Sequence, residues 1–179
     1  MIVPIDEFFA LRQRLPVVDV RSEVEYERGH IPSAINIPLL NNSERVAVGT
    51  TYKQMGQQAA INVGFRLVGP RLGDLVETSR QVGEEFLVHC WRGGMRSSNF
   101  CKFMQMGRIK PHQLQGGYKA YRQHALEIFK RPFKFIALCG FTGSGKSEIL
   151  RAIENEGEQI LDLEKIASHK GSVFGGLMM

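Results

Sequence analysis

His89-Cys90-Trp91-Arg92-Gly93-Gly94-Met95-Arg96-Ser97 is the stretch around which this sequence is organised. The apolar residues 86–88 lead directly into it and predict a short buried strand. Residues 97–106 follow it and carry apolar side chains at helical spacing. The stretch is therefore expected to form a loop that joins the end of a strand to the start of a helix.

The composition of this loop favours nucleophilic chemistry at Cys90. Its two glycines let successive backbone N–H groups turn toward an anion, and the helix N-terminus and the arginines add positive potential there. A positive potential favours the thiolate, which is the nucleophilic form of cysteine. We predict that Cys90 is catalytic and that Arg96 and Arg92 bind an oxyanion. The alternative is a buried cysteine beside an ordinary tight turn.

Length, apolar runs and cysteine usage limit the classes of protein that fit. The 179 residues suffice for one domain and part of another. No apolar run approaches the roughly 20 residues of a membrane span, and the N-terminus lacks a signal-peptide pattern, so a cytoplasmic protein without a membrane partner is expected. Three cysteines without C-x-x-C spacing argue against a disulfide framework and a metal site. Cys101 and Cys139 are expected to be core residues.

Basic residues are concentrated in one part of the chain. The net charge is +5, yet ten lysines and arginines but only one acidic residue, Glu127, fall between Arg92 and Lys134. Such a block suits a polyanionic partner such as nucleic acid. The alternatives are a solvated basic face or arginines that serve only a small anion.

The remaining pattern predicts alternating helices and strands. Helices are expected over 5–15, 22–28 and 72–82, and a buried strand over 17–20. Residues 31–37 are expected to be extended. Residues 41–70 are poorly informative, with a helix suggested only over 54–61.

Several motifs in this first part resemble the rhodanese family. They are Asp19-Val20-Arg21, Glu25-Tyr26, Gly29-His30-Ile31-Pro32, Ala34-x-Asn36-Ile37-Pro38, the loop at Cys90, and Leu114 to Tyr121. The resemblance covers about residues 5–124. It implies an α/β fold with a doubly wound parallel sheet over 1–124 and the cysteine at the carboxyl end of a strand.

A second motif follows a linker expected over 125–133. The apolar residues 134–139 predict a strand, and Gly140-Phe141-Thr142-Gly143-Ser144-Gly145-Lys146-Ser147 fits the phosphate-binding pattern G-x-x-x-x-G-K-Ser. We predict that phosphate is bound by Gly140, Gly143, Ser144, Gly145, Lys146 and Ser147. A helix over 148–154 and a short strand over 159–163 should follow. Since only 32 residues come after Ser147, residues 134–179 are expected to be an incomplete P-loop NTPase-like domain.

The order of the two domains is similar to that of the tRNA 2-selenouridine synthases. The loop at Cys90 and the segments 162–164 and 167–175 resemble theirs, and this chain resembles their first half. The resemblance implies a tRNA partner whose wobble 2-thiouridine is geranylated from geranyl diphosphate and then receives selenium from selenophosphate. Cys90 would carry selenium or sulfur, and residues 140–147 would hold a diphosphate, or a nucleotide with Mg²⁺.

The resemblance implies no tightly bound cofactor. A selenophosphate-producing enzyme is a further candidate partner. The missing half places the full reaction in question for this chain. The sequence does not determine the oligomeric state.

The spacing of the cysteine loop leaves two alternatives open. Cys90 to Arg96 spans seven residues, C-x5-R, which resembles the rhodanese-like phosphatases and arsenate reductases. A third possibility is a non-catalytic tRNA-binding fragment. Thiol-dependent phosphoester turnover would favour the first alternative, and salt-sensitive tRNA binding without turnover would favour the other.

Overall fold

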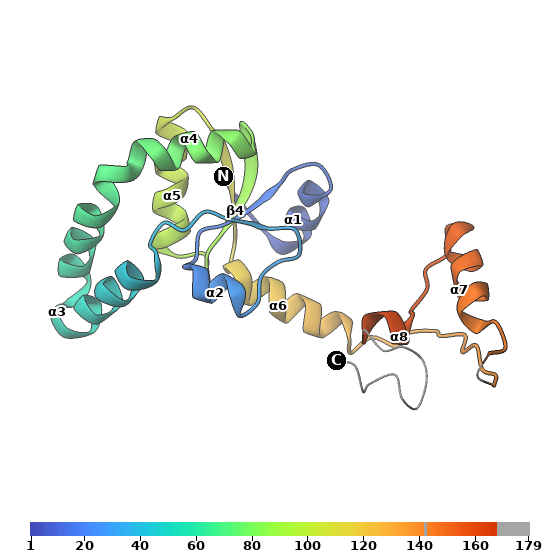
Figure 1. The fold of residues 1–179 in the computed structure, drawn as a ribbon. Coiled ribbons are helices and arrows are strands. Elements are labelled where there is room, and N and C mark those ends of the chain that lie inside the picture. The colour runs from blue at the N-terminus through green and yellow to red at the C-terminus, as the bar shows by residue number, and fades with distance from the viewer. Residues whose placement is uncertain (142, 168–179) are drawn as a thin grey trace. The chain divides into compact units, whose positions relative to one another are not determined.

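The computed structural model describes residues 1–141 and 143–167 (Figure 1). By internal contacts the chain divides into two units, Met1–Arg131 and Pro132–Met179. The first unit continues past the expected boundary at residue 124, because its last helix runs on to Ile128. No helix in the described ranges combines the length and the apolar character needed to cross a membrane.

The first unit is built on one parallel sheet. Its strands are β1 (Ile2–Val3), β2 (Val17–Asp19), β3 (Ile35–Asn36), β4 (Glu85–His89) and β5 (Lys110–Leu114), in the order β1-β5-β4-β2-β3. All four strand pairs are parallel. The strand that precedes Cys90, β4, is therefore the central one.

Helices cover both faces of this sheet. They are α1 (Ile5–Arg12), α2 (Glu23–Glu27), α3 (Asn42–Val68), α4 (Leu72–Val82), α5 (Met95–Met106) and α6 (Gly117–Ile128), with a 3-10 turn at Gly69–Arg71. Val18 and Val88 belong to a core cluster with α4 and α5, whereas Val17 and Leu87 belong to a second cluster with α1 and α6. Because neighbouring residues of a strand point to opposite faces, burial of both faces explains the continuous apolar runs. The doubly wound parallel fold expected from the sequence is confirmed.

Two strands of this sheet are not predicted by the pattern of apolar residues in the sequence. β5 has the sequence Lys-Pro-His-Gln-Leu, and β1 contains only two residues. Conversely, the extended segment expected over 31–37 contributes only Ile35–Asn36 to the sheet. Pairing with neighbouring strands, rather than local apolar character, decides these three elements.

The segment 41–70, where the sequence is poorly informative, forms α3, the longest helix of the described residues. It contains 27 residues and is bent at Gly56, whose φ of 85° is not helical. The helix suggested over 54–61 lies within α3, and the rest of α3 was not foreseen because only Ala60 and Val68 of this helix are buried, which leaves little apolar periodicity. A start signal was nevertheless present, since Asn41 and Glu44 form a capping box.

The second unit contains helices but no strand within its described residues. Its helices are α7 (Lys146–Asn155) and α8 (Leu163–Ile166). The strands expected over 134–139 and 159–163 are absent, and Cys139, expected in a core, is exposed. An apolar run pairs as a strand only where another strand offers its hydrogen-bonding edge, and no such edge is present in the described part of this unit.

Candidate functional site

Cys90 lies where the carboxyl ends of three strands meet. It directly follows β4, and β5 with the segment after it packs against its loop through three hydrogen bonds. The backbone N–H of Tyr118 donates to the Cys90 carbonyl at 2.9 Å, and that of Lys119 donates to the Trp91 carbonyl at 3.0 Å. The Gln113 side chain donates to the Gly93 carbonyl at 2.6 Å. The end of β5 and the segment that follows it thus brace the cysteine loop.

Two glycines make this close approach possible. Gly93 has φ 65° and Gly117 has φ 60°, a region that L side chains rarely adopt. A Cβ on Gly93 would lie 2.9 Å from the Leu114 carbonyl oxygen, and one on Gly117 would lie 2.6 Å from the Gly93 nitrogen. The two backbone segments can meet only because neither glycine carries a side chain.

The Cys90 thiol is buried beside a hydroxyl group. The residue is 3% exposed, and its Sγ lies 3.2 Å from the Oγ of Ser97, which in turn donates to the Gly94 carbonyl at 3.2 Å. The backbone N–H groups of residues 92–94 donate no hydrogen bond to another group of the described chain. The loop therefore keeps donors available for an anion. Ser97 was not predicted as a site residue, although its place directly after the arginine of C-x5-R is a local signal.

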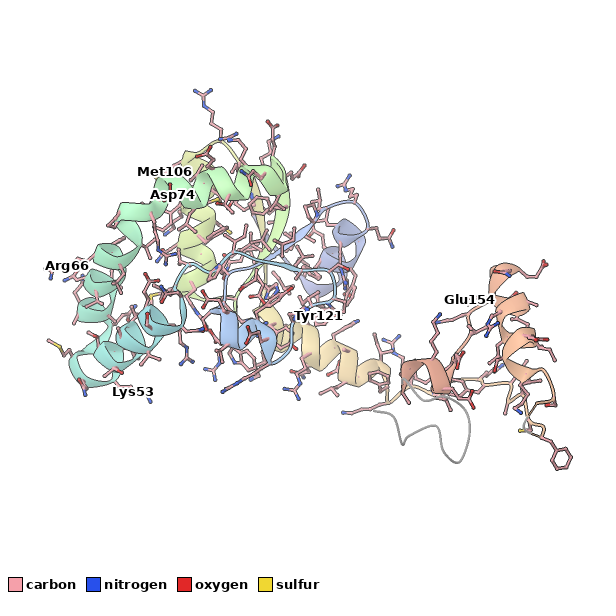
Figure 2. All side chains as sticks on the ribbon, viewed as in Figure 1. Lys53, Arg66, Asp74, Met106, Tyr121 and Glu154 are labelled. Atoms are coloured by element: carbon pink, nitrogen blue, oxygen red, sulfur yellow. The ribbon has the colours of Figure 1, made fainter. Side chains whose placement is uncertain are left out.

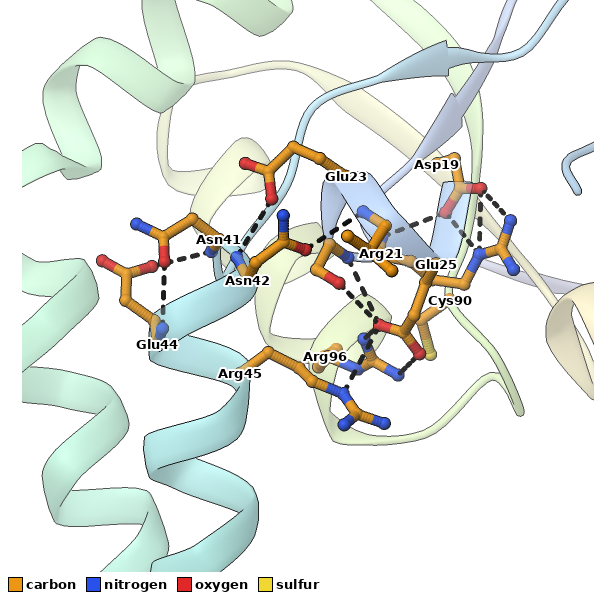
Figure 3. Close-up of polar contacts among 12 residues, drawn as sticks. Asp19, Arg21, Glu23, Glu25, Asn41, Asn42, Glu44, Arg45, Cys90 and Arg96 are labelled. Atoms are coloured by element: carbon orange, nitrogen blue, oxygen red, sulfur yellow. Dashed lines mark hydrogen bonds and ion pairs between the residues drawn. The ribbon is translucent and has the colours of Figure 1, made fainter. Parts of the chain in front are cut away.

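Arg96 is paired with a carboxylate in this structure, whereas the sequence predicted that it binds an oxyanion. Its guanidinium binds both oxygens of Glu25, at 2.5 and 3.2 Å, while Arg45 Nε lies 3.8 Å from the same carboxylate (Figure 3). Burial alone would raise the pKa of Glu25, but the hydrogen bond and charge of Arg96 leave that pKa lowered. Burial alone would likewise lower the pKa of Arg96, whereas Glu25 and, to a smaller extent, Cys90 leave it raised. Arg92 is exposed and forms no ion pair with any described residue.

The starts of α2 and α3 are joined beside this pair. The Asn42 N–H donates to a Glu23 carboxylate oxygen at 3.0 Å, and the Val24 N–H donates to the Asn42 side chain at 3.0 Å (Figure 3). This reciprocal contact holds the first turn of α3 against α2. As a result, Arg45 and Glu25 come together although the sequence separates them widely.

A buried ion pair lies next to the cysteine loop. Arg21 binds Asp19 through Nε at 3.0 Å and Nη2 at 2.6 Å, and its guanidinium lies 4.2 Å from the centre of the Tyr118 ring. His89 Nε2 is 3.7 Å from Asp19. Burial lowers the pKa of His89 to about 4 even though the Asp19 charge opposes this shift, so His89 is neutral at pH 7. These buried side chains contact one another and Tyr118, which fixes the end of β2 beside the cysteine loop.

The glycine-rich loop of the second unit leads into a helix, as its pattern predicts. Gly143 and Gly145 have φ values of 80° and 79°, and α7 begins at Lys146. The Lys146 ammonium donates to the carbonyls of Gly140 and Phe141 at 2.9 and 2.7 Å. Of the six predicted phosphate ligands, Gly140, Ser144 and Lys146 therefore already contact one another. The residues 168–175 that carry the tail resemblance lie outside the described residues.

Two further findings bear on metal and nucleic-acid binding. Within 1–141 and 143–167 no group of three or more His, Cys, Asp or Glu side chains could hold a metal ion. The basic stretch of the first unit does not form one surface. Arg108 and Lys110 lie at the start of β5, whereas Arg92 and Lys119 lie beyond the carboxyl ends of β4 and β5. The basic residues that form one block in the sequence therefore lie at two opposite ends of the sheet.

Comparisons with known proteins match both units. Residues 6–124 match the rhodanese-like domain family, and residues 133–179 match the tRNA 2-selenouridine synthase AAA domain. A tRNA 2-selenouridine synthase from Proteus mirabilis (strain HI4320) is 42% identical over 173 residues, which cover 92% of this chain and 46% of that protein. One from Nitrosomonas europaea is 37% identical over 172 residues and covers 90% of this chain and 44% of that protein. The chain thus spans about half the length of the curated relatives it matches.

A solved structure agrees with the first unit. It is the N-terminal domain of a putative ATP/GTP binding protein from Clostridium difficile 630, which is 38% identical with a TM-score of 0.66. The match covers 70% of this chain and 99% of that domain.

Proposed function

We propose that this chain, a member of the tRNA 2-selenouridine synthase family, acts in replacing sulfur by selenium at the wobble 2-thiouridine of tRNA. The family matches are a rhodanese-like domain at 6–124 and the tRNA 2-selenouridine synthase AAA domain at 133–179. In this proposal a geranyl group from geranyl diphosphate first alkylates the sulfur. Selenium from selenophosphate then replaces the thioether. Cys90 is the thiol of the selenium step, and the reaction takes place on cytoplasmic tRNA.

One observation carries the assignment of Cys90. Its buried Sγ lies beside the Ser97 hydroxyl, in a loop whose backbone N–H groups at residues 92–94 have no acceptor in the described chain. Selenophosphate is a tetrahedral anion, and a seven-residue loop offers several N–H donors to its oxygens. On deprotonation of Cys90, the single hydroxyl proton of Ser97 can turn from the Gly94 carbonyl to the thiolate and stabilise its charge.

The Cys90→Ser substitution tests this role. We expect the variant to lose selenium loading from selenophosphate, measured by mass spectrometry of the intact chain, while it keeps its affinity for phosphate. Cys101→Ser is the matched control, because burial raises the pKa of Cys101 to about 12 and keeps that thiol protonated. Loading that persists in Cys90→Ser would assign the selenium step to another group.

The phosphorus product shows which bond Cys90 forms. If the Cys90 thiolate attacks selenium, an S–Se bond forms and the Se–P bond breaks. The electron pair of the Se–P bond stays on phosphorus, so the products are a Cys90 perselenide and phosphite. Attack of Cys90 on phosphorus instead expels selenide and leaves an S-phosphocysteine, which water converts to phosphate. Phosphorus NMR of a single turnover distinguishes the two balanced routes.

The glycine-rich loop is proposed to bind the phosphates of the geranyl donor, or a nucleotide with Mg²⁺. Its described residues supply a helix N-terminus and the Lys146 charge, both suited to a diphosphate. Occupation of this loop would require Lys146 to leave the carbonyls of Gly140 and Phe141. Titration with geranyl diphosphate, GTP and ATP, each with and without Mg²⁺, identifies the ligand.

The C-x5-R spacing also favours a second function, hydrolysis of a phosphomonoester. The same thiolate and N–H groups would serve an attack on phosphorus. Turnover of a generic aryl phosphate that depends on Cys90 would support this function, and arsenate reduction would be tested in the same way.

A further inference from the structure

A groove lies between α3 and the start of α5, next to the cysteine loop. Its volume is about 120 Å³. Leu39, Tyr52 and Phe65 are among the apolar side chains that line it, and Met95 and Arg96 of the cysteine loop complete the wall. In Figure 1, α3 bends back at its kink with α5 on the inner side of the bend. The groove therefore shares two wall residues with the cysteine loop.

The bend of α3 leaves this groove unfilled. Lys53 and Arg66, on either side of the kink, point outward (Figure 2). Both halves of α3 contribute apolar side chains to the groove, among them Val48 and Ile61. Tyr52 remains 53% exposed, Phe65 58% and Met95 46%. Large apolar side chains gathered at a groove in this way mark a binding surface more often than isolated ones do.

Charge indicates what kind of molecule fits. Among the described residues of the groove wall, Arg96 of the cysteine loop alone is charged, and its guanidinium is paired with Glu25. Arg45, which is half exposed, lies beside the same carboxylate, so the two arginines and Glu25 together carry an excess of one positive charge. A ligand with an apolar chain and a phosphate-bearing part at the loop end would match both features.

We propose that this groove in the rhodanese-like unit receives the branched apolar chain of a prenylated substrate and so presents the carbon–sulfur bond of a prenyl thioether to the Cys90 loop. The inference rests on one part of the proposed function, namely that a geranyl group is attached to the sulfur of the RNA. Two sources share the chemistry of the ligand, the geranyl thioether of the RNA and geranyl diphosphate. The position beside Cys90 favours the thioether, since that is the group selenium must displace.

Gly64 offers a direct test, because it lines the groove and a Cβ there would meet no atom within 4 Å. Gly64→Ala and Gly64→Leu fill the groove stepwise. Gly49→Leu is the matched control on the same helix, where a Cβ would also meet nothing within 4 Å and the residue is not part of the wall. All three replace a helical glycine by a better helix former, so the fold is retained, as circular dichroism would verify.

The probes are an anticodon stem-loop with S-geranyl-2-thiouridine, the same stem-loop with 2-thiouridine, and geranyl diphosphate, titrated calorimetrically into the full chain. We expect Gly64→Leu to weaken binding of the geranylated stem-loop by about tenfold or more, and Gly64→Ala by less, because the geranyl chain then buries less apolar area. Gly49→Leu should leave it unchanged, and the 2-thiouridine stem-loop should bind all variants alike. An effect confined to geranyl diphosphate would assign the groove to that source.

Equal affinity of wild type and Gly64→Leu for both geranylated probes would overturn the proposal. So would a wild-type dimer that Gly64→Leu dissociates without any change in geranyl affinity, because the groove would then be an interface between two copies. Selenium loading of Cys90 is measured separately. If loading fails while Gly64→Leu still weakens geranyl binding, the proposed function is rejected and the groove assignment stands.

Discussion

At the scale of single residues, the contact between Glu25 and Arg96 governs how an anion can enter the cysteine loop. Both oxygens of the Glu25 carboxylate already bind the Arg96 guanidinium. An incoming oxyanion must therefore either displace Glu25 or bind only to backbone N–H groups. Arg45 offers Glu25 a second partner after such a displacement. The sequence predicted Arg96 as an anion ligand but contained no sign of this competition.

The Glu25→Gln variant distinguishes the two modes of binding. Because a neutral amide competes less for a guanidinium than a carboxylate does, we expect phosphate to bind about three- to tenfold more tightly. Glu23→Gln is the control, since Glu23 contacts Asn42 and not Arg96. The measurement is the phosphate concentration that protects Cys90 from alkylation. An unchanged value would show that Arg96 stays on Glu25 and that backbone groups bind the anion.

His89 predicts a pH dependence of stability. Its folded pKa of about 4 lies below the ordinary value of 6.5, so between these values the unfolded chain binds more protons than the folded one. The free energy of unfolding should therefore fall as the pH is lowered from 6.5 to 4, by on the order of 3 kcal/mol from this residue. Urea unfolding at several pH values checks this slope.

Replacement of His89 isolates its share of the slope. His89→Gln should flatten the pH dependence in this window, while His124→Gln, which is not among the groups that shift the His89 pKa, should preserve it. A slope that is identical in wild type and His89→Gln would contradict the assignment.

At the scale of elements, the packing of the cysteine loop against the segment after β5 depends on one backbone conformation. Gly93→Ala would place a Cβ 2.9 Å from two backbone atoms at a φ of 65°. We expect a loss of about 2–3 kcal/mol in the free energy of unfolding. Gly94→Ala is the control, because its Cβ would meet nothing within 4 Å and its φ of −93° suits any residue. Similar urea midpoints for the two variants would show that the loop can move away from β5.

At the scale of the whole molecule, the separation of the basic residues predicts where the proposed tRNA partner would bind. Lys119 and Arg122 are exposed on α6, whose first turn contacts the cysteine loop, whereas Arg108 and Lys110 lie at the opposite end of β5. Reversing the first pair to Glu should weaken tRNA binding and reduce its salt dependence. The slope of log K against log salt should fall by roughly 0.9 for each duplex phosphate that the variant no longer neutralises.

The second pair provides the matched control. Arg108→Glu with Lys110→Glu changes the net charge equally, and filter binding at several salt concentrations compares the two variants. If both pairs weaken binding to the same extent, the effect is one of net charge and not of a surface near Cys90.

The sequence by itself determined the features that depend on neighbours along the chain. The apolar run before Cys90 predicts β4, the glycines and arginines after it predict an anion-binding loop, and Ser22 with Glu25 predicts the capped start of α2. Such signals are readable because strand alternation, helix periodicity and capping involve residues at most a few positions apart. The G-x-x-x-x-G-K-Ser pattern likewise predicted the start of α7 to within two residues.

Only the tertiary structure decided the features that depend on distant partners. β5 is polar and becomes a strand because β4 and β1 supply hydrogen-bonding edges on both sides, while the apolar residues 134–139 find no such edge in the described chain. Glu25 reaches Arg96 across 71 positions, and the groove exists because α3 bends at Gly56 around the start of α5. Sheet order and helix packing bring these groups together, and neither is encoded in the spacing of residues along the chain.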